Sequence, residues 1–174
     1  EALVAWGSYP LEKMLPRFAG PVVFVGHGSG QFDHNAARIT GPAATHYTAV
    51  AEASVPPLVA AGVNPSHVTV LHNGIDPGRC KQTMSRDELR RRLGVANDQF
   101  LVGYIGRMVP EKNPLGVAKA VALLPDRFRA VFVGDGWDMA QQREDVRAAL
   151  GDRAMFVDRV ENIGDYYRAI DCFA

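Results

Sequence analysis

Cysteine is scarce in this chain, and the thiols present are poorly placed for joint chemistry. Two occur in 174 residues, Cys80 and Cys172, and neither belongs to a CxxC pair. This usage argues against a disulfide framework or a zinc site and favours reduced thiols in a cytoplasmic protein. The five histidines also lack a metal-ligand spacing such as HExxH, so no metal site is predicted.

An excess of charge and long apolar runs are missing as well. The 19 Lys and Arg residues balance 19 Asp and Glu residues, which argues against a nucleic-acid binder. A small phosphorylated ligand needs only a few local cations, so the balance leaves that class open. The apolar runs are too short to span a bilayer, and no signal-peptide pattern opens the chain.

Several named motifs are absent too. There is no GxxxxGK[ST], which excludes a P-loop, and no GxSxG, which argues against a hydrolase. The Gly134-Asp135-Gly136 segment lacks the third glycine of GxGxxG, so a dinucleotide oxidoreductase ranks last among the alternatives. The glycine cluster at 26–30 has no helical pattern directly after it, and its default role is a turn or a close backbone approach.

What the chain does contain is an alternation of short apolar runs and helical patterns. We predict strands at 22–26, 46–51, 68–74, 100–106, 129–134 and 154–158, with a further strand beginning at 171. We predict helices at 54–62, 85–94, 114–124, 138–151 and 163–170. Residues 74–84 are rich in turn formers and are interpreted as a linker. This pattern predicts an α/β protein with parallel sheets and helices on both faces.

The helix predicted at 85–94 has clear end signals. Ser85 and Glu88 form a capping box, and Gly94 ends the helix. Its arginines at 90–92 lie late, where the helix dipole favours cations. We interpret them as a solvated helix end rather than a binding patch.

Candidate site residues follow the predicted strands, where open parallel sheets bind ligands. Arg107 can donate two hydrogen bonds to phosphate oxygens, and Lys112 can act as a point charge, so the two could hold a diphosphate. The alternative is an ordinary surface arginine and a Glu111-Lys112 pair. His27, which ends the first predicted strand, could reach a ligand or be a structural histidine.

The ordered set of segments TAVAEAS, VTVLHNGID, RDELRRRLG, VGYIGRMVPEKNP, VFVGDG and FVDRVENIGDYYRAIDCFA resembles the retaining glycosyltransferases of family 4. The resemblance begins near residue 22. It implies the GT-B fold, in which two Rossmann-like domains face each other across a cleft. Residues 1–76 would be the C-terminal part of the acceptor-side domain, and residues 77–174 the N-terminal part of the donor-side domain, both incomplete.

The resemblance also implies roles for particular residues. Arg107 and Lys112 match the family's cations that hold the diphosphate of a nucleotide sugar, and His27 matches a histidine that points at the donor sugar. These three are the candidate catalytic residues. The nucleotide would be bound by Gly106, Arg107, Lys112, Gly134, Asp135, Gly136, Asp158, Arg159 and Val160.

The implied activity is transfer of a sugar from a UDP- or GDP-sugar to an unknown acceptor, with retention and with no metal or cofactor. The family's acidic signature, an E-G-F-G loop and a second glutamate, is expected just after Ala174 and is absent. The chain also begins without Met. We therefore expect a piece of a longer enzyme that is inactive alone and binds a diphosphate weakly.

Two alternatives to a transferase stay open. One is a nucleotide-sugar epimerase of similar fold, which would carry different carboxylates in the missing segment. The other is a non-catalytic nucleotide-sugar-binding or scaffold protein, whose full chain would lack one or both glutamates. We expect a cytoplasmic location, with peripheral contact to the inner membrane through the missing part of the first domain as a possible addition.

Overall fold

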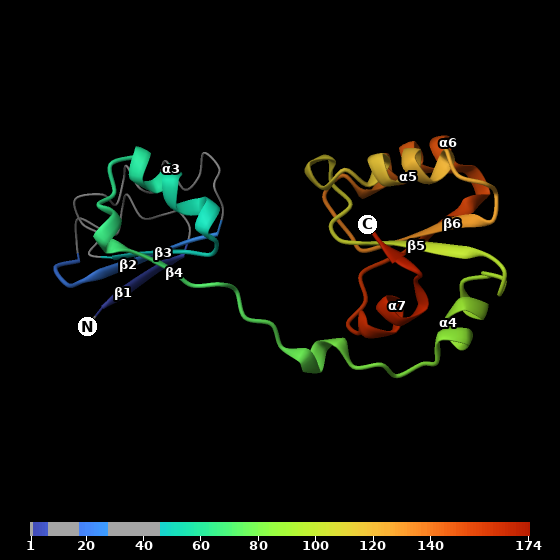
Figure 1. Ribbon diagram of the computed structural model, residues 1–174, viewed down its shortest axis with the longest axis horizontal. Helices are drawn as coiled ribbons and strands as arrows, with labels where there is room; N and C mark the ends of the chain where they lie inside the picture. Colours follow the sequence, from blue (N-terminus) through green and yellow to red (C-terminus); the bar gives the residue numbers. More distant parts are fainter. Residues whose placement is uncertain (1, 7–17, 28–45) are drawn as a thin grey trace. The chain divides into compact units, whose positions relative to one another are not determined.

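The computed structural model describes residues 2–6, 18–27 and 46–174, and the chain divides into two compact units, Glu1–Ile75 and Asp76–Ala174 (Figure 1). The break lies inside the segment interpreted as a linker. Most of the glycine cluster after the first predicted strand, residues 28–30, lies outside the described residues.

The first unit contains a parallel sheet whose strands lie in chain order. They are β1 (Leu3–Trp6), β2 (Val22–Gly26), β3 (His46–Ala49) and β4 (Val68–Val70). The turn η2 (Glu52–Ser54) leads into α3 (Val55–Ala60), which covers one face of the sheet, and η3 (Pro65–His67) precedes β4 (Figure 1). The strand β1 was not expected from the sequence, and β4 ends earlier than the predicted 68–74.

The core of the first unit is small and continuous. The rings of Phe24 and Tyr47 on neighbouring strands lie 5.8 Å apart, and Leu58 of α3 is buried with them. The residues of β2 alternate between buried and half-buried positions along the strand, as expected of a strand with one face more covered than the other.

The second unit has a parallel sheet whose strand order departs from chain order. The order is β7-β6-β5-β8, with β5 (Phe100–Ile105), β6 (Phe128–Val133), β7 (Ala154–Val157) and β8 (Cys172–Phe173). The chain builds outward from β5 to β7 and then crosses back to place β8 on the other side of β5. Such a reversal is where open α/β sheets commonly bind ligands, beyond the carboxyl ends of the strands.

Helices cover both faces of this second sheet. Figure 1 shows α5 (Pro114–Ala122) and α6 (Met139–Leu150) on one face and α4 (Arg86–Arg92) and α7 (Gly164–Ala169) on the other. Short turns η4 (Pro77–Cys80), η5 (Pro110–Lys112) and η6 (Gly151–Arg153) complete the unit. Within the described part of the chain, no helix has the length and apolar character needed to cross a membrane.

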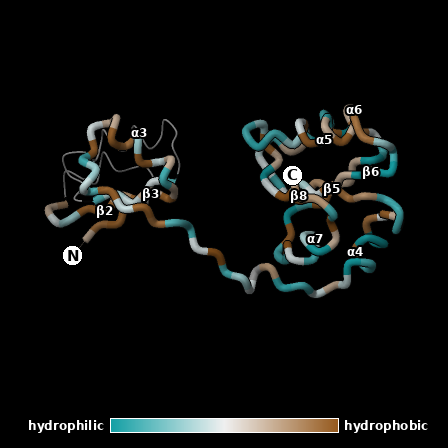
Figure 2. The backbone as a smooth tube through the Cα atoms, in the orientation of Figure 1, coloured by the Kyte–Doolittle hydropathy of each residue, from teal (hydrophilic) through white to brown (hydrophobic). Residues whose placement is uncertain are grey.

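Alternation along the strands separates two apolar clusters. Tyr104 and Phe132 face α5 and α6, with ring centroids 5.7 Å apart, whereas Leu101 and Val131 belong to the cluster under α4 and α7. All four side chains are buried, and Figure 2 shows the hydrophobic residues concentrated along the strands. Burial on both faces explains why these strands appear in the sequence as continuous apolar runs.

Candidate functional site

A pocket lies at the carboxyl ends of β5, β6 and β7, and we call it the strand-end pocket. Its volume is about 350 Å³. Its lining consists of Ile105, Gly106, Arg107, Val133, Gly134, Asp135, Arg159, Val160 and Ile163. Three loops that are far apart in the sequence therefore meet here, and most of the predicted nucleotide-binding residues are among them.

The backbone of the strand-end pocket depends on a glycine. Gly134 has a φ of +139°, and a Cβ built on it would lie 2.0 Å from the carbonyl oxygen of Gly106. The amides of Gly106 and Gly134 donate to the carbonyls of Val133 and Val157, both at 3.0 Å, and so continue the sheet ladder past the strands. Only glycine lets the ends of β5 and β6 approach this closely.

The loop that carries Arg107 is fixed from behind. The Tyr104 hydroxyl donates to the carbonyl of Arg107 at 2.6 Å, and the amide of Val109 donates to the same oxygen at 3.0 Å. The amide of Met108 donates to the carbonyl of Asp135 at 2.7 Å. Met108 and Val109 are buried, whereas Arg107 is exposed and lines the pocket.

The charges of the strand-end pocket favour an anion. Arg107 and Arg159 supply two guanidinium groups, and Asp135 supplies one carboxylate. A guanidinium presents several N–H donors in a fixed plane, which suits phosphate oxygens. The sequence predicted a role for Arg159 through the backbone of its loop, and in the structure this exposed arginine is among the residues that line the pocket.

Lys112 lies in a different place from Arg107. It ends η5 and precedes Asn113, which caps α5 with its side chain by accepting from the amide of Gly116 at 3.0 Å. Lys112 lines a second pocket of about 550 Å³ between α5 and β5, together with Val102 and Ala174. Among the pockets formed by the described residues, the lysine and the arginine therefore line different ones.

Two other predicted residues support the pocket rather than line it. A Cβ on Gly136 would lie 2.5 Å from the carbonyl oxygen of Met108, so this glycine lets the loop after β6 pack on the loop after β5. Asp158 is 79% exposed and pairs with Arg143 of α6 at 2.6 Å. The Asp158 carboxylate thus ties the loop after β7 to α6.

His27 belongs to the first unit. It directly follows β2, at the carboxyl end of that strand, and is exposed. Its predicted role toward a ligand of the other unit stays a prediction.

Asp165, at the start of α7, is a buried carboxylate that the sequence did not predict. It is 3% exposed and accepts hydrogen bonds from the amide and hydroxyl of Thr83, both at 2.6 Å, and from the amide of Met84 at 2.9 Å. The side chain of Asn162 donates to it at 3.1 Å. These contacts anchor the end of the linker to α7, and an Asn-x-x-Asp sequence alone gives no signal for partners so distant.

Asp165 makes the stability of the second unit depend on pH. The hydrogen bonds from Met84 and Thr83 hold the pKa of Asp165 below its ordinary value. Since the folded-state pKa is depressed, the stabilisation is present above the unfolded-state pKa, near 4, and is lost as the pH falls through the folded-state pKa. We expect Asp165→Asn to destabilise at pH 7 by about 1–3 kcal/mol. We also expect the free energy of unfolding of this variant to fall less steeply between pH 7 and 3 than that of the parent chain, as measured by urea unfolding. The same pH dependence in both chains would contradict the role of Asp165.

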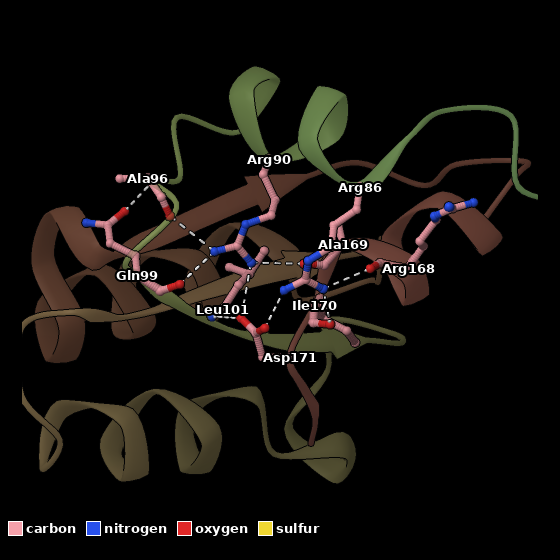
Figure 3. Close-up of polar contacts among 9 residues, drawn as sticks. All are labelled: Arg86, Arg90, Ala96, Gln99, Leu101, Arg168, Ala169, Ile170 and Asp171. Carbon is pink, nitrogen blue, oxygen red and sulfur yellow. Dashed lines mark hydrogen bonds and ion pairs between the residues drawn. The ribbon is translucent and has the colours of Figure 1, made fainter.

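The predicted solvated end of helix 85–94 is wrong for Arg90. Its side chain is 4% exposed and donates to the carbonyls of Ala169 at 3.1 Å and Gln99 at 2.6 Å (Figure 3). It also pairs with Asp171 at 3.1 Å, and Arg86 pairs with the same carboxylate. The segments around Gln99 and Asp171 pack against α4, and their oxygen atoms accept enough hydrogen bonds for the Arg90 guanidinium to be buried.

Asp171 is the acceptor that unites this network. Burial opposes its ionisation, but hydrogen bonds from the amide of Leu101, at 2.7 Å, and from Arg86 and Arg90 hold its pKa below the ordinary value. Asp171 therefore links α4, β5 and the segment that enters β8. Among the described residues, no group of three or more His, Cys, Asp or Glu side chains is arranged to hold a metal ion.

Comparison with known proteins shows which family and which relatives this chain resembles. The sequence model of a family described as Glycosyl transferases group 1 matches residues 85–174. The lipopolysaccharide core biosynthesis mannosyltransferase LpsB of Rhizobium meliloti is 35% identical over 114 residues, which cover 60% of this chain and 32% of LpsB. A UDP-Gal:alpha-D-GlcNAc-diphosphoundecaprenol alpha-1,3-galactosyltransferase of Escherichia coli is 33% identical over 81 residues, covering 42% of this chain and 21% of that protein.

Solved structures show the same fold. HepE of Anabaena in complex with UDP-glucose superposes with a TM-score of 0.77 at 25% identity, covering 88% of this chain and 46% of HepE. The predicted fold class, two parallel Rossmann-like units of GT-B type, is confirmed by this likeness. The chain spans about a third or less of the curated relatives it matches and just under half of HepE.

Proposed function

The chain belongs to the family of group 1 glycosyl transferases, and on this basis we propose that its second unit binds the nucleotide diphosphate of a sugar donor in the strand-end pocket. The observation that supports this is the meeting of Arg107, Arg159 and the glycine backbone at one edge of the sheet. In this proposal, residues 1–76 form the end of the acceptor-side domain and residues 77–174 the beginning of the donor-side domain.

The proposed reaction transfers the sugar to an acceptor with retention of configuration, without a protein nucleophile, metal or cofactor. As the bond to the sugar breaks, negative charge grows on the leaving diphosphate. Guanidinium groups placed beforehand stabilise that charge more in the transition state than in the ground state. Since the chain spans only part of its relatives, the activity is proposed for the whole protein, and this chain alone is expected to bind the nucleotide without turnover.

A UDP-sugar is the donor that the comparisons favour. HepE was crystallised with UDP and with UDP-glucose, and the name of the Escherichia coli relative specifies UDP-Gal. A GDP-sugar is the second candidate, as the family resemblance implies, and the name of LpsB, a mannosyltransferase, states no nucleotide that would decide between the two. Ligand-observed NMR of the chain with UDP, GDP and ADP distinguishes them, and we expect UDP to bind most tightly.

The strongest test of the site is Arg107→Ala. Loss of a charge-assisted hydrogen bond costs about 1.5–3 kcal/mol, so we expect the Kd for UDP to rise about 10- to 100-fold. Arg107 is exposed, so thermal unfolding of the variant should match that of the parent. Arg91→Ala, which removes an exposed arginine from α4 outside the pocket, is the matched control for loss of one positive charge.

Lys112→Ala distinguishes two forms of the proposal. A weakened UDP complex would mean that the lysine reaches the diphosphate from the neighbouring loop, as the family resemblance implies. An unchanged complex would mean that Arg107 and Arg159 hold the diphosphate without it, as the pocket lining indicates. If UDP binds the Arg107→Ala variant as tightly as the parent, the assignment of the pocket to the diphosphate is wrong.

A further inference from the structure

Tyr104 places a polar group inside an otherwise apolar cluster. It lies on β5, is 5% exposed, and packs with Met108 and Val121 in the core under α5 and α6. A buried hydroxyl costs free energy unless it makes a hydrogen bond. A phenylalanine would fill the same space without that cost, so the hydroxyl calls for an explanation beyond packing.

The explanation lies in what the hydroxyl holds. It donates to the carbonyl of Arg107 at 2.6 Å, three residues along the chain. Burial raises the pKa of Tyr104, and the nearby Arg107 charge opposes that shift to a smaller extent. The hydroxyl therefore stays protonated and remains a donor.

The hydrogen bond acts on the residue where the chain leaves the sheet. The carbonyl of Arg107 accepts from both the Tyr104 hydroxyl and the amide of Val109, so two hydrogen bonds fix this peptide group. The amide of Met108 is fixed to the carbonyl of Asp135 on the neighbouring loop. With its backbone held in this way, the exposed Arg107 side chain starts from a fixed point on the pocket wall.

We propose that Tyr104 is a positioning residue for the donor's diphosphate, and that its hydroxyl orients Arg107 toward the phosphate oxygens through the Arg107 carbonyl. This inference rests on the proposed function. Preorganised donors bind charge better because they need no reordering when the ligand arrives.

Tyr104→Phe tests the inference because it removes one oxygen and keeps the ring beside Phe132. A single hydrogen bond of this kind corresponds to about a 3- to 10-fold change in affinity. We expect the Kd for UDP to rise by this factor, while the affinity for uridine, which has no phosphate, stays the same. Tyr167→Phe, an exposed tyrosine of α7, is the matched control and should change neither.

A double-mutant cycle with Arg107→Ala separates positioning from a structural effect. If Tyr104 acts through Arg107, Tyr104→Phe causes no further loss of UDP affinity in the Arg107→Ala background. Equal losses for UDP and uridine, or the same loss in both backgrounds, would overturn the inference.

The cycle also identifies which proposal fails. If Arg107→Ala weakens UDP binding and Tyr104→Phe does not, the role of Tyr104 is wrong and the pocket assignment stands. If Arg107→Ala has no effect, both the diphosphate site and the role of Tyr104 are wrong.

Discussion

Replacing Arg90 with alanine is expected to lower the free energy of unfolding of the second unit by about 3–5 kcal/mol, the usual cost of removing one partner from a buried ion pair. The guanidinium is 4% exposed, and its loss leaves the carbonyls of Ala169 and Gln99 without their donor. It also removes one of the two cations that face Asp171 (Figure 3).

Arg86→Ala is the internal comparison for this prediction. Arg86 pairs with the same carboxylate, but its side chain is 38% exposed, so solvent screens the interaction. We expect a loss of about 1 kcal/mol or less. Urea unfolding measures the loss of stability, and amide hydrogen exchange of β5 assigns that loss to the second unit. Equal losses for the two variants would show that burial of Arg90 is not the source of its contribution.

The elements that the sequence predicted well are those stabilised locally or buried on both faces. The strand at 100–105 and the part of the next strand at 130–133 are continuous apolar runs because helices cover both sides of their sheet. The start of α4 follows from Ser85, whose hydroxyl accepts from the amide of Glu88 at 3.2 Å as a capping residue should. The predicted capping box also assigned the Glu88 side chain to the start of the helix, but in the structure the Glu88 carboxylate pairs with Arg92 at 2.7 Å.

The features that the sequence did not predict depend on partners far along the chain. Arg90 contacts Asp171, and Asp165 contacts Thr83, each across about eighty residues. Local periodicity contains no signal for such contacts, so a buried arginine and a solvated one give the same pattern. In the first unit, β1 is only four residues long and has no recognisable boundary in the sequence.

The separation of Arg107 from Lys112 has a local cause that spacing cannot show. After Arg107 the chain makes the turn η5, which ends at Lys112, and Asn113 then adopts a left-handed conformation with a φ of +51°. Lys112 then lines the pocket beside α5, whereas Arg107 lines the pocket at the ends of the strands. Two cations five residues apart can therefore lie in one pocket or in two, according to the loop between them.

The second large effect is expected from Gly134→Ala. A Cβ there would lie 2.0 Å from the carbonyl oxygen of Gly106, which is backbone and cannot rotate away. The φ of +139° adds strain for any residue with a side chain. We expect the free energy of unfolding to fall by about 2–5 kcal/mol, as the strain and the steric clash combine. We also expect UDP binding to be lost as the ends of β5 and β6 separate.

Gly151→Ala separates these two causes, because Gly151 also has a positive φ, +61°, but a Cβ there would meet nothing within 4 Å. Its cost should be that of the backbone conformation alone, a φ of +61° with a ψ of −136°, about 1–3 kcal/mol, with UDP affinity unchanged. If both alanine variants lose the same stability and both bind UDP, the close approach of Gly134 to Gly106 does not shape the pocket. If only Gly134→Ala loses binding, the close approach of the loops after β5 and β6 is what shapes the pocket beside Arg107.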